Sequence, residues 1–165
     1  RRRIETPVYL RCSVEDVVAG STLAPGTFEL LWSQIYTWTH EEWSPVDDSD
    51  EARAAIASEA RELDLDRTAV ALVDGEPAAV AFVFDDPGAS TVCAESVRRD
   101  TPDADEALTR AVAWVVRDAH GRSEHRLAFD GHESDPHFGP LARRLCLEGA
   151  RLSLLESPVP SRADS

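Results

Sequence analysis

The segment VALVDGEPAAVAFVF at residues 70–84 constrains the fold more than any other part of the chain. Two runs of apolar and small residues flank an Asp-Gly pair, which is typical of a tight hairpin turn because both positions tolerate positive φ angles. We therefore expect strands over residues 68–73 and 78–84. A second turn precedes residues 90–97 (STVCAESV), which predict a third consecutive strand.

Helices are expected before this three-strand unit. The apolar side chains of residues 27–38 recur at helical spacing, and so do those of residues 49–63, where Asp48 and Glu51 have the spacing of a capping box. Residues 7–12 (PVYLRC) alternate in polarity, which predicts an opening strand that leads into a short helix.

Helices and strands also alternate after the three strands. Residues 101–103 (TPD) resemble a helix start, and Gly121 is expected to end that helix. Residues 125–130 predict a strand, residues 135–145 a helix and residues 150–155 a last strand. A strand, a helix and a strand in succession imply a parallel pair with a right-handed crossover, whereas the hairpin implies antiparallel neighbours. The expected fold is α/β (α+β), a mixed central sheet flanked by helices.

The composition fits one domain over residues 7–156, with a polar lead-in at residues 1–6 and a flexible tail at residues 157–165. A net charge of −14 repels nucleic acid and favours cationic partners. Apolar stretches are far shorter than the roughly 20 residues of a membrane span, so no membrane is expected. Three cysteines without a close pair indicate reduced thiols and a cytoplasmic location.

This order of elements over residues 7–156 is similar to that of the GCN5-related N-acetyltransferase family. The opening PVYLRCSVED and the hairpin at residues 70–84 carry the closest match. The resemblance implies that acetyl-CoA or another acyl-CoA binds between strands 90–97 and 125–130, which splay apart. Its pyrophosphate would lie on amides at the start of the intervening helix. The cofactor-binding residues implied are Ser96, Val97, Arg98 and Arg99, and the implied reaction is N-acyl transfer to a small amine, for which the negative charge of the chain favours a cationic substrate.

The loop VRRDTPDADEAL at residues 97–108 departs from the family pattern, because it has no glycine and carries four carboxylates. Acidic residues in a first turn stabilise the helix through its dipole, but they repel a pyrophosphate. The sequence therefore leaves a second interpretation open, a non-catalytic binding or regulatory domain of the same fold that has lost CoA binding. A homodimer or a neighbouring domain is also left open.

Three residues are candidates for proton transfer. Glu95 stands on the strand before the loop, where the resemblance implies a general base, and the alternative is an outward-facing Glu with no role. The family's tyrosine is missing from residues 136–145 (PHFGPLARRL), so His132 or His137 would take its place as the acid. The histidines near residues 120–137 match no known zinc spacing, which leaves a metal-dependent enzyme as a distant third interpretation.

Overall fold

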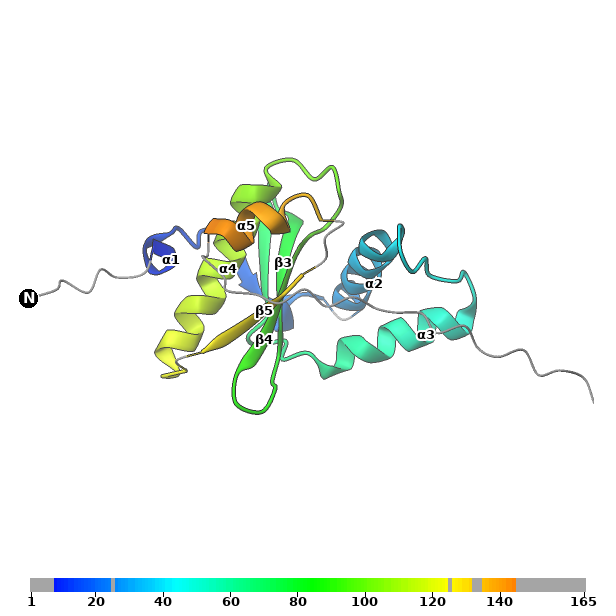
Figure 1. The fold of residues 1–165 in the computed structure, drawn as a ribbon, viewed down its shortest axis with the longest axis horizontal. Helices are drawn as coiled ribbons and strands as arrows, with labels where there is room; N and C mark the ends of the chain where they lie inside the picture. Colours follow the sequence, from blue (N-terminus) through cyan, green and yellow to red (C-terminus); the bar gives the residue numbers. More distant parts are fainter. Residues whose placement is uncertain (1–7, 25, 125, 132–134, 145–165) are drawn as a thin grey trace, which may run out of the picture.

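The structure, a computed structural model, describes residues 8–24, 26–124, 126–131 and 135–144. Within them one sheet has the strand order β1-β2-β3-β4-β5 (Figure 1). Neighbours are antiparallel up to β4, whereas β4 and β5 are parallel. The expected mixed sheet is confirmed. Its strands are β1 (Val17–Ala19), β2 (Ala69–Val73), β3 (Glu76–Phe84), β4 (Ser90–Ser96) and β5 (Leu127–Asp130).

Helices cover both faces of the sheet, as expected for this fold class. The helices α2 and α3 lie on one face and α4 on the other, while α1 and α5 lie beside α4 (Figure 1). Their bounds are α1 (Val8–Arg11), α2 (Thr27–His40), α3 (Asp50–Glu59), α4 (Ala104–Gly121) and α5 (Phe138–Arg144), with 3-10 turns η1 (Gly20–Thr22) and η2 (Ala60–Glu62).

The predicted hairpin forms between β2 and β3. Its turn residues Asp74 and Gly75 have φ angles of 52° and 82°, as a type I′ turn requires, and Val73 pairs with Glu76. A bulge between Ala71 and Leu72 shifts the register. The turn chemistry read from the sequence therefore sets the pairing of the central strands.

Small side chains make the contact between the sheet and α4. Alanines of β2, β3 and β4 and alanines of α4 are buried together, with Leu108, Val112 and Val115 filling the spaces between them. Alanine lets a helix approach a sheet closely, so this interface is stabilised by close packing of small side chains and not by large apolar ones alone. On the other face, α2 packs Phe28, Trp32 and Ile35 onto the strands, and the Trp32 and Phe82 rings meet edge to face at 4.9 Å.

The expected opening strand at residues 7–12 is wrong. This segment contains α1, and the first strand is β1, which pairs antiparallel with β2 at Val17↔Ala71. The physical reason is Arg117 of α4, whose guanidinium donates to the carbonyls of Leu10 and Cys12. Those carbonyls are therefore bound to α4 and unavailable to a sheet.

Two predicted helix starts move by a residue or two. Ser49, not Asp48, caps α3 by accepting the amide of Ala52 at 3.2 Å. The hydroxyl of Thr101 bonds back to Arg98, so Thr101 closes a loop, and α4 begins only at Ala104 after Asp103. Gly121 ends α4 as expected. The predicted strand at residues 150–155, the lead-in and the tail lie outside the described residues.

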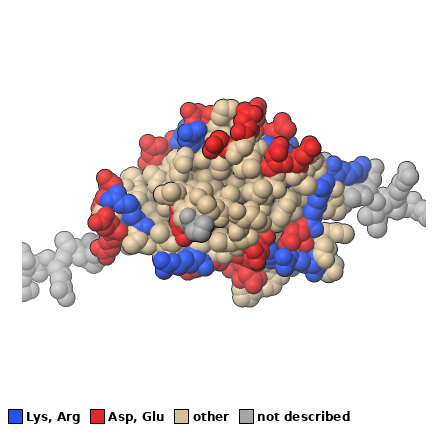
Figure 2. Space-filling view, turned by 180° about the vertical axis from the view of Figure 1, so that it is seen from behind, with Lys and Arg blue, Asp and Glu red and all other residues tan. Residues whose placement is uncertain are grey.

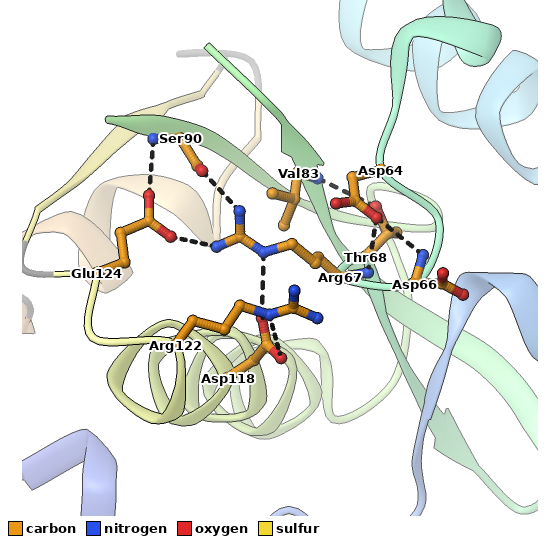
Figure 3. A network of polar contacts seen from close by, with 9 residues as sticks. All are labelled: Asp64, Asp66, Arg67, Thr68, Val83, Ser90, Asp118, Arg122 and Glu124. Carbon is orange, nitrogen blue, oxygen red and sulfur yellow. Dashed lines mark hydrogen bonds and ion pairs between the residues drawn. The ribbon is translucent and has the colours of Figure 1, made fainter. Parts of the chain in front are cut away.

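A buried arginine ties α4 to the sheet at the start of β4 (Figure 3). Arg67 donates to Ser90 Oγ at 2.8 Å and to Asp118 Oδ2 at 3.1 Å, and it also binds Glu124. Burial lowers the pKa of Arg67, but its bonds to Glu124 and Asp118 outweigh this effect and raise the pKa above the usual value. The network fixes the end of α4 against the strands that carry the candidate site.

Candidate functional site at the end of β4

Pairing between β4 and β5 stops before β4 ends. The last parallel pair is Cys93 with Asp130, and β4 continues as far as Ser96 paired only with β3 on its other side. Because every second amide of a strand points to the same neighbour, the amide of Ser96 points toward the β5 side. The expected parallel pair is therefore present, and its pairing ends at Cys93 and Asp130, where β5 also ends.

Asp135 occupies the space beside Ser96. Its Oδ2 accepts the Ser96 amide at 3.0 Å, and its Oδ1 accepts the amide of His137 at 2.7 Å. Ser96 is fully buried and Asp135 is 2% exposed. A carboxylate that takes hydrogen bonds from two amides in a buried position is a fixed part of the structure, so it closes the end of the strand pair.

Sequence reasoning missed this role for Asp135 and expected it only to open the next helix. It does hold the start of that turn through the His137 amide. The available signal was an Asp-Pro pair shortly after the second parallel strand, where a carboxylate can reach back to the end of the first.

Glu95 is buried, at 1% exposure, so the outward-facing alternative is wrong. The alternation of β4 places Cys93, Glu95 and Val97 on the face covered by α2 and α3. The Cys93 thiol lies 3.7 Å from Glu95 Oε1, and burial, followed by the charges of Glu95 and Asp130, raises the pKa of Cys93 well above its ordinary value. Glu95 therefore lies on the opposite face of β4 from the side chain of Ser96.

His137 is held by α4. Its Nδ1 lies 2.9 Å from Asp105 Oδ1, in the first turn of that helix. A carboxylate at Nδ1 fixes the orientation of the ring. His132 lies outside the described residues. Within the described ranges no group of three or more His, Cys, Asp or Glu side chains is arranged to hold a metal ion.

The loop expected to hold pyrophosphate uses two of its amides inside the protein and leads into an acidic helix start. The amide of Val97 donates to Ala78 O at 2.9 Å, and that of Arg98 to Thr101 Oγ1 at 2.9 Å, so both are used inside the protein. The carboxylates of Asp105 and Glu106 occupy the first turn of α4. A diphosphate at this helix start would meet these like charges, which argues against acyl-CoA here.

The side chains of Arg98 and Arg99 make their contacts away from the start of α4. Arg99 donates to Glu42 Oε1 at 2.8 Å, and its guanidinium lies 5.9 Å from the centre of the Trp38 ring. Arg98 lines a groove of about 660 Å³ between α2, residues 46–48 and α3. The structure thus directs Arg98 toward the face covered by α2 and α3.

The wider surface gives no single charged patch on the face turned toward the viewer in Figure 2. Acidic and basic side chains alternate around the rim of that face, and its centre consists mostly of other residues. On this face the charged side chains therefore lie around the rim and leave the centre uncharged for the most part. None of the helices in the described part of the chain has the length and apolarity needed to cross a bilayer.

Comparisons with known proteins identify two similar solved structures but no family. No protein-family model matches the chain, and no curated protein matches it. Two solved structures of TTHA1254 from Thermus thermophilus align with it at 19% identity, covering 84% of this chain and 98% of theirs. The TM-scores are 0.45 for a point mutant and 0.41 for the wild type, so these likenesses carry no functional argument.

Proposed function

We propose that the chain is a domain of acetyltransferase-like fold that binds a small ligand without using acyl-CoA. The bond from the Ser96 amide to Asp135 Oδ2 carries the proposal. In the family that the sequence resembles, this end of the first separated strand would meet the acyl group, whereas here a buried carboxylate takes the amide. The acidic first turn of α4 supports the same conclusion, because it opposes a diphosphate.

N-acyl transfer from acyl-CoA to an amine is the second candidate. It is favoured by the end of β4–β5 pairing at Cys93 and Asp130, which leaves the last part of β4 without a partner on the β5 side, and by the buried carboxylate of Glu95 beyond that point. This candidate requires Asp135 to leave the Ser96 amide.

Calorimetric titration with acetyl-CoA and with free CoA separates the two candidates. We expect no saturable heat with the folded wild-type protein at millimolar ligand. Micromolar binding that is weakened by the double change Arg98→Ala, Arg99→Ala, but not by the matched change Arg61→Ala, would overturn the proposal. Acylation of an amine panel that Glu95→Gln abolishes while binding persists would then establish acyl transfer.

A further inference from the structure

The groove beside Arg98 is an open surface groove with the volume of a small-molecule site. Its volume of about 660 Å³ lies within the range of roughly 300–1,000 Å³ typical of such sites. Residues from α2, from the segment 46–48 and from α3 form its sides. Three separate segments thus converge on one hollow.

Trp38 gives the groove a fixed aromatic wall. The indole Nε1 donates to the carbonyl of Ser96 at 3.2 Å, and Arg99 lies over the ring while bound to Glu42. Val46 and Ile56 also line the groove and add apolar surface. A wall that is held before the ligand arrives lowers the ordering cost of binding.

Some charged side chains of the groove form ion pairs with one another, and others form none within the described residues. Arg53 binds Asp48 and also donates to Asp50 at 3.1 Å. Asp47 and the guanidinium of Arg98 make no ion pair within the described residues, and Arg98 uses only its backbone in the loop. One carboxylate and one guanidinium are therefore available to a ligand.

We propose that this groove binds a zwitterion, an amino acid or a short peptide with an apolar side chain. Asp47 would receive the ammonium group, Arg98 the carboxylate in a bidentate contact, and Trp38 with its apolar neighbours the side chain. A purely cationic ligand would leave Arg98 unmatched, and a purely anionic one would be repelled by Asp47 and by the net charge of −14. The inference rests on the proposed function, binding of a small ligand without acyl-CoA.

The test is calorimetric titration with phenylalanine, phenylalanine amide and N-acetylphenylalanine. The amide lacks the carboxylate and the acetyl derivative lacks the ammonium, so each should bind at least about ten-fold more weakly than phenylalanine. The peptide phenylalanyl-glycine distinguishes the two sources of the same chemistry. Tighter binding of the peptide would identify a peptide ligand, and tighter binding of phenylalanine a free amino acid.

Matched variants locate the two contacts. Arg98→Gln should weaken phenylalanine about ten-fold and leave the affinity of phenylalanine amide unchanged, while Asp47→Asn should weaken phenylalanine and leave N-acetylphenylalanine unchanged. The controls Arg61→Gln and Asp86→Asn remove exposed charges that do not line the groove. All four are surface changes, so the variants should fold.

Three results would overturn the inference: no saturable binding of phenylalanine or the peptide, equal affinity for phenylalanine amide, or affinity unaffected by Arg98→Gln and Asp47→Asn. Titration of the same samples with acetyl-CoA keeps the two proposals separate. Binding of acetyl-CoA contradicts the proposed function, whereas the absence of saturable heat with phenylalanine and the peptide contradicts only the assignment of the groove.

Discussion

Asp135 accepts the amide of Ser96 at 3.0 Å at the point where β4 has lost its pairing with β5. The same carboxylate accepts the amide of His137 at 2.7 Å, so one side chain joins the end of the sheet to the segment before α5. This closure places a negative charge where a strand pair of this kind would otherwise present a free amide.

Replacing Asp135 by Ala should lower the free energy of unfolding by about 1–3 kcal/mol, because the buried Ser96 amide would lose its acceptor. Asp135→Asn should cost less, since its amide oxygen can still accept one of the two bonds. Urea unfolding followed by circular dichroism measures both. An unfolding midpoint that Asp135→Ala leaves unchanged would show that water replaces the carboxylate.

Local turn and periodicity signals predicted the central part of the fold well. The Asp74-Gly75 turn, the stripe of α2 and the parallel pair around α4 follow from short-range chemistry. The start of the chain was predicted wrongly because an alternation over only six residues is too short to establish a strand. Its conformation is decided by Arg117, which lies about a hundred residues away in the sequence.

In the candidate site, too, features that depend on neighbouring residues were predicted, and features that depend on distant residues were not. Glu95 and Arg98 could be singled out from their place on β4 and after it, but the partner of the Ser96 amide was missed, because Asp135 lies 39 positions away and only an Asp-Pro pair pointed to it. The groove was also invisible in the sequence, since it joins Trp38 to Arg98 through folding alone. Long-range pairing is what sequence patterns do not record.

Arg67 should be the most sensitive charged residue in the fold. Arg67→Ala would leave Asp118 and Glu124 without their shared cation, and we expect a loss of about 3 kcal/mol in the free energy of unfolding. Arg67→Lys should recover only part of it, because a single ammonium cannot reach Ser90 and both carboxylates in the geometry of a guanidinium.

The matched control for Arg67 is Arg122→Ala. Arg122 also binds Asp118, at 2.8 Å, but its side chain is 54% exposed, so its removal should cost less than about 1 kcal/mol. Equal losses of unfolding free energy for the two variants, measured by urea unfolding, would mean that the burial of Arg67 does not strengthen its ion pairs with Asp118 and Glu124.

The Cys93 thiol should resist alkylation in the folded protein. Burial raises its pKa most, and the charge of Glu95 raises it further, so little thiolate is present near pH 8. Iodoacetamide labelling followed by peptide mass spectrometry should show Cys93 reacting far more slowly than in urea-unfolded chain. Glu95→Gln removes a negative neighbour, which lowers the pKa of Cys93 and should move its labelling profile to lower pH. A profile that does not move would contradict the contact.

Glu124 should make the free energy of unfolding depend on pH in the acidic range. Burial raises its pKa, but hydrogen bonds from Ser90 and Arg67 outweigh burial and bring the pKa below the ordinary value of 4.5. A depressed folded-state pKa means that this contribution is complete above pH 4.5 and is lost as the pH falls through the folded value. The difference in unfolding free energy between wild type and Glu124→Gln should therefore be largest near neutral pH and shrink below pH 4.5. Glu62→Gln, an exposed change without an ion pair among the described residues, should show a flat difference over the same range. A difference for Glu124→Gln that grows on acidification would reverse the sign and contradict the ion pair with Arg67.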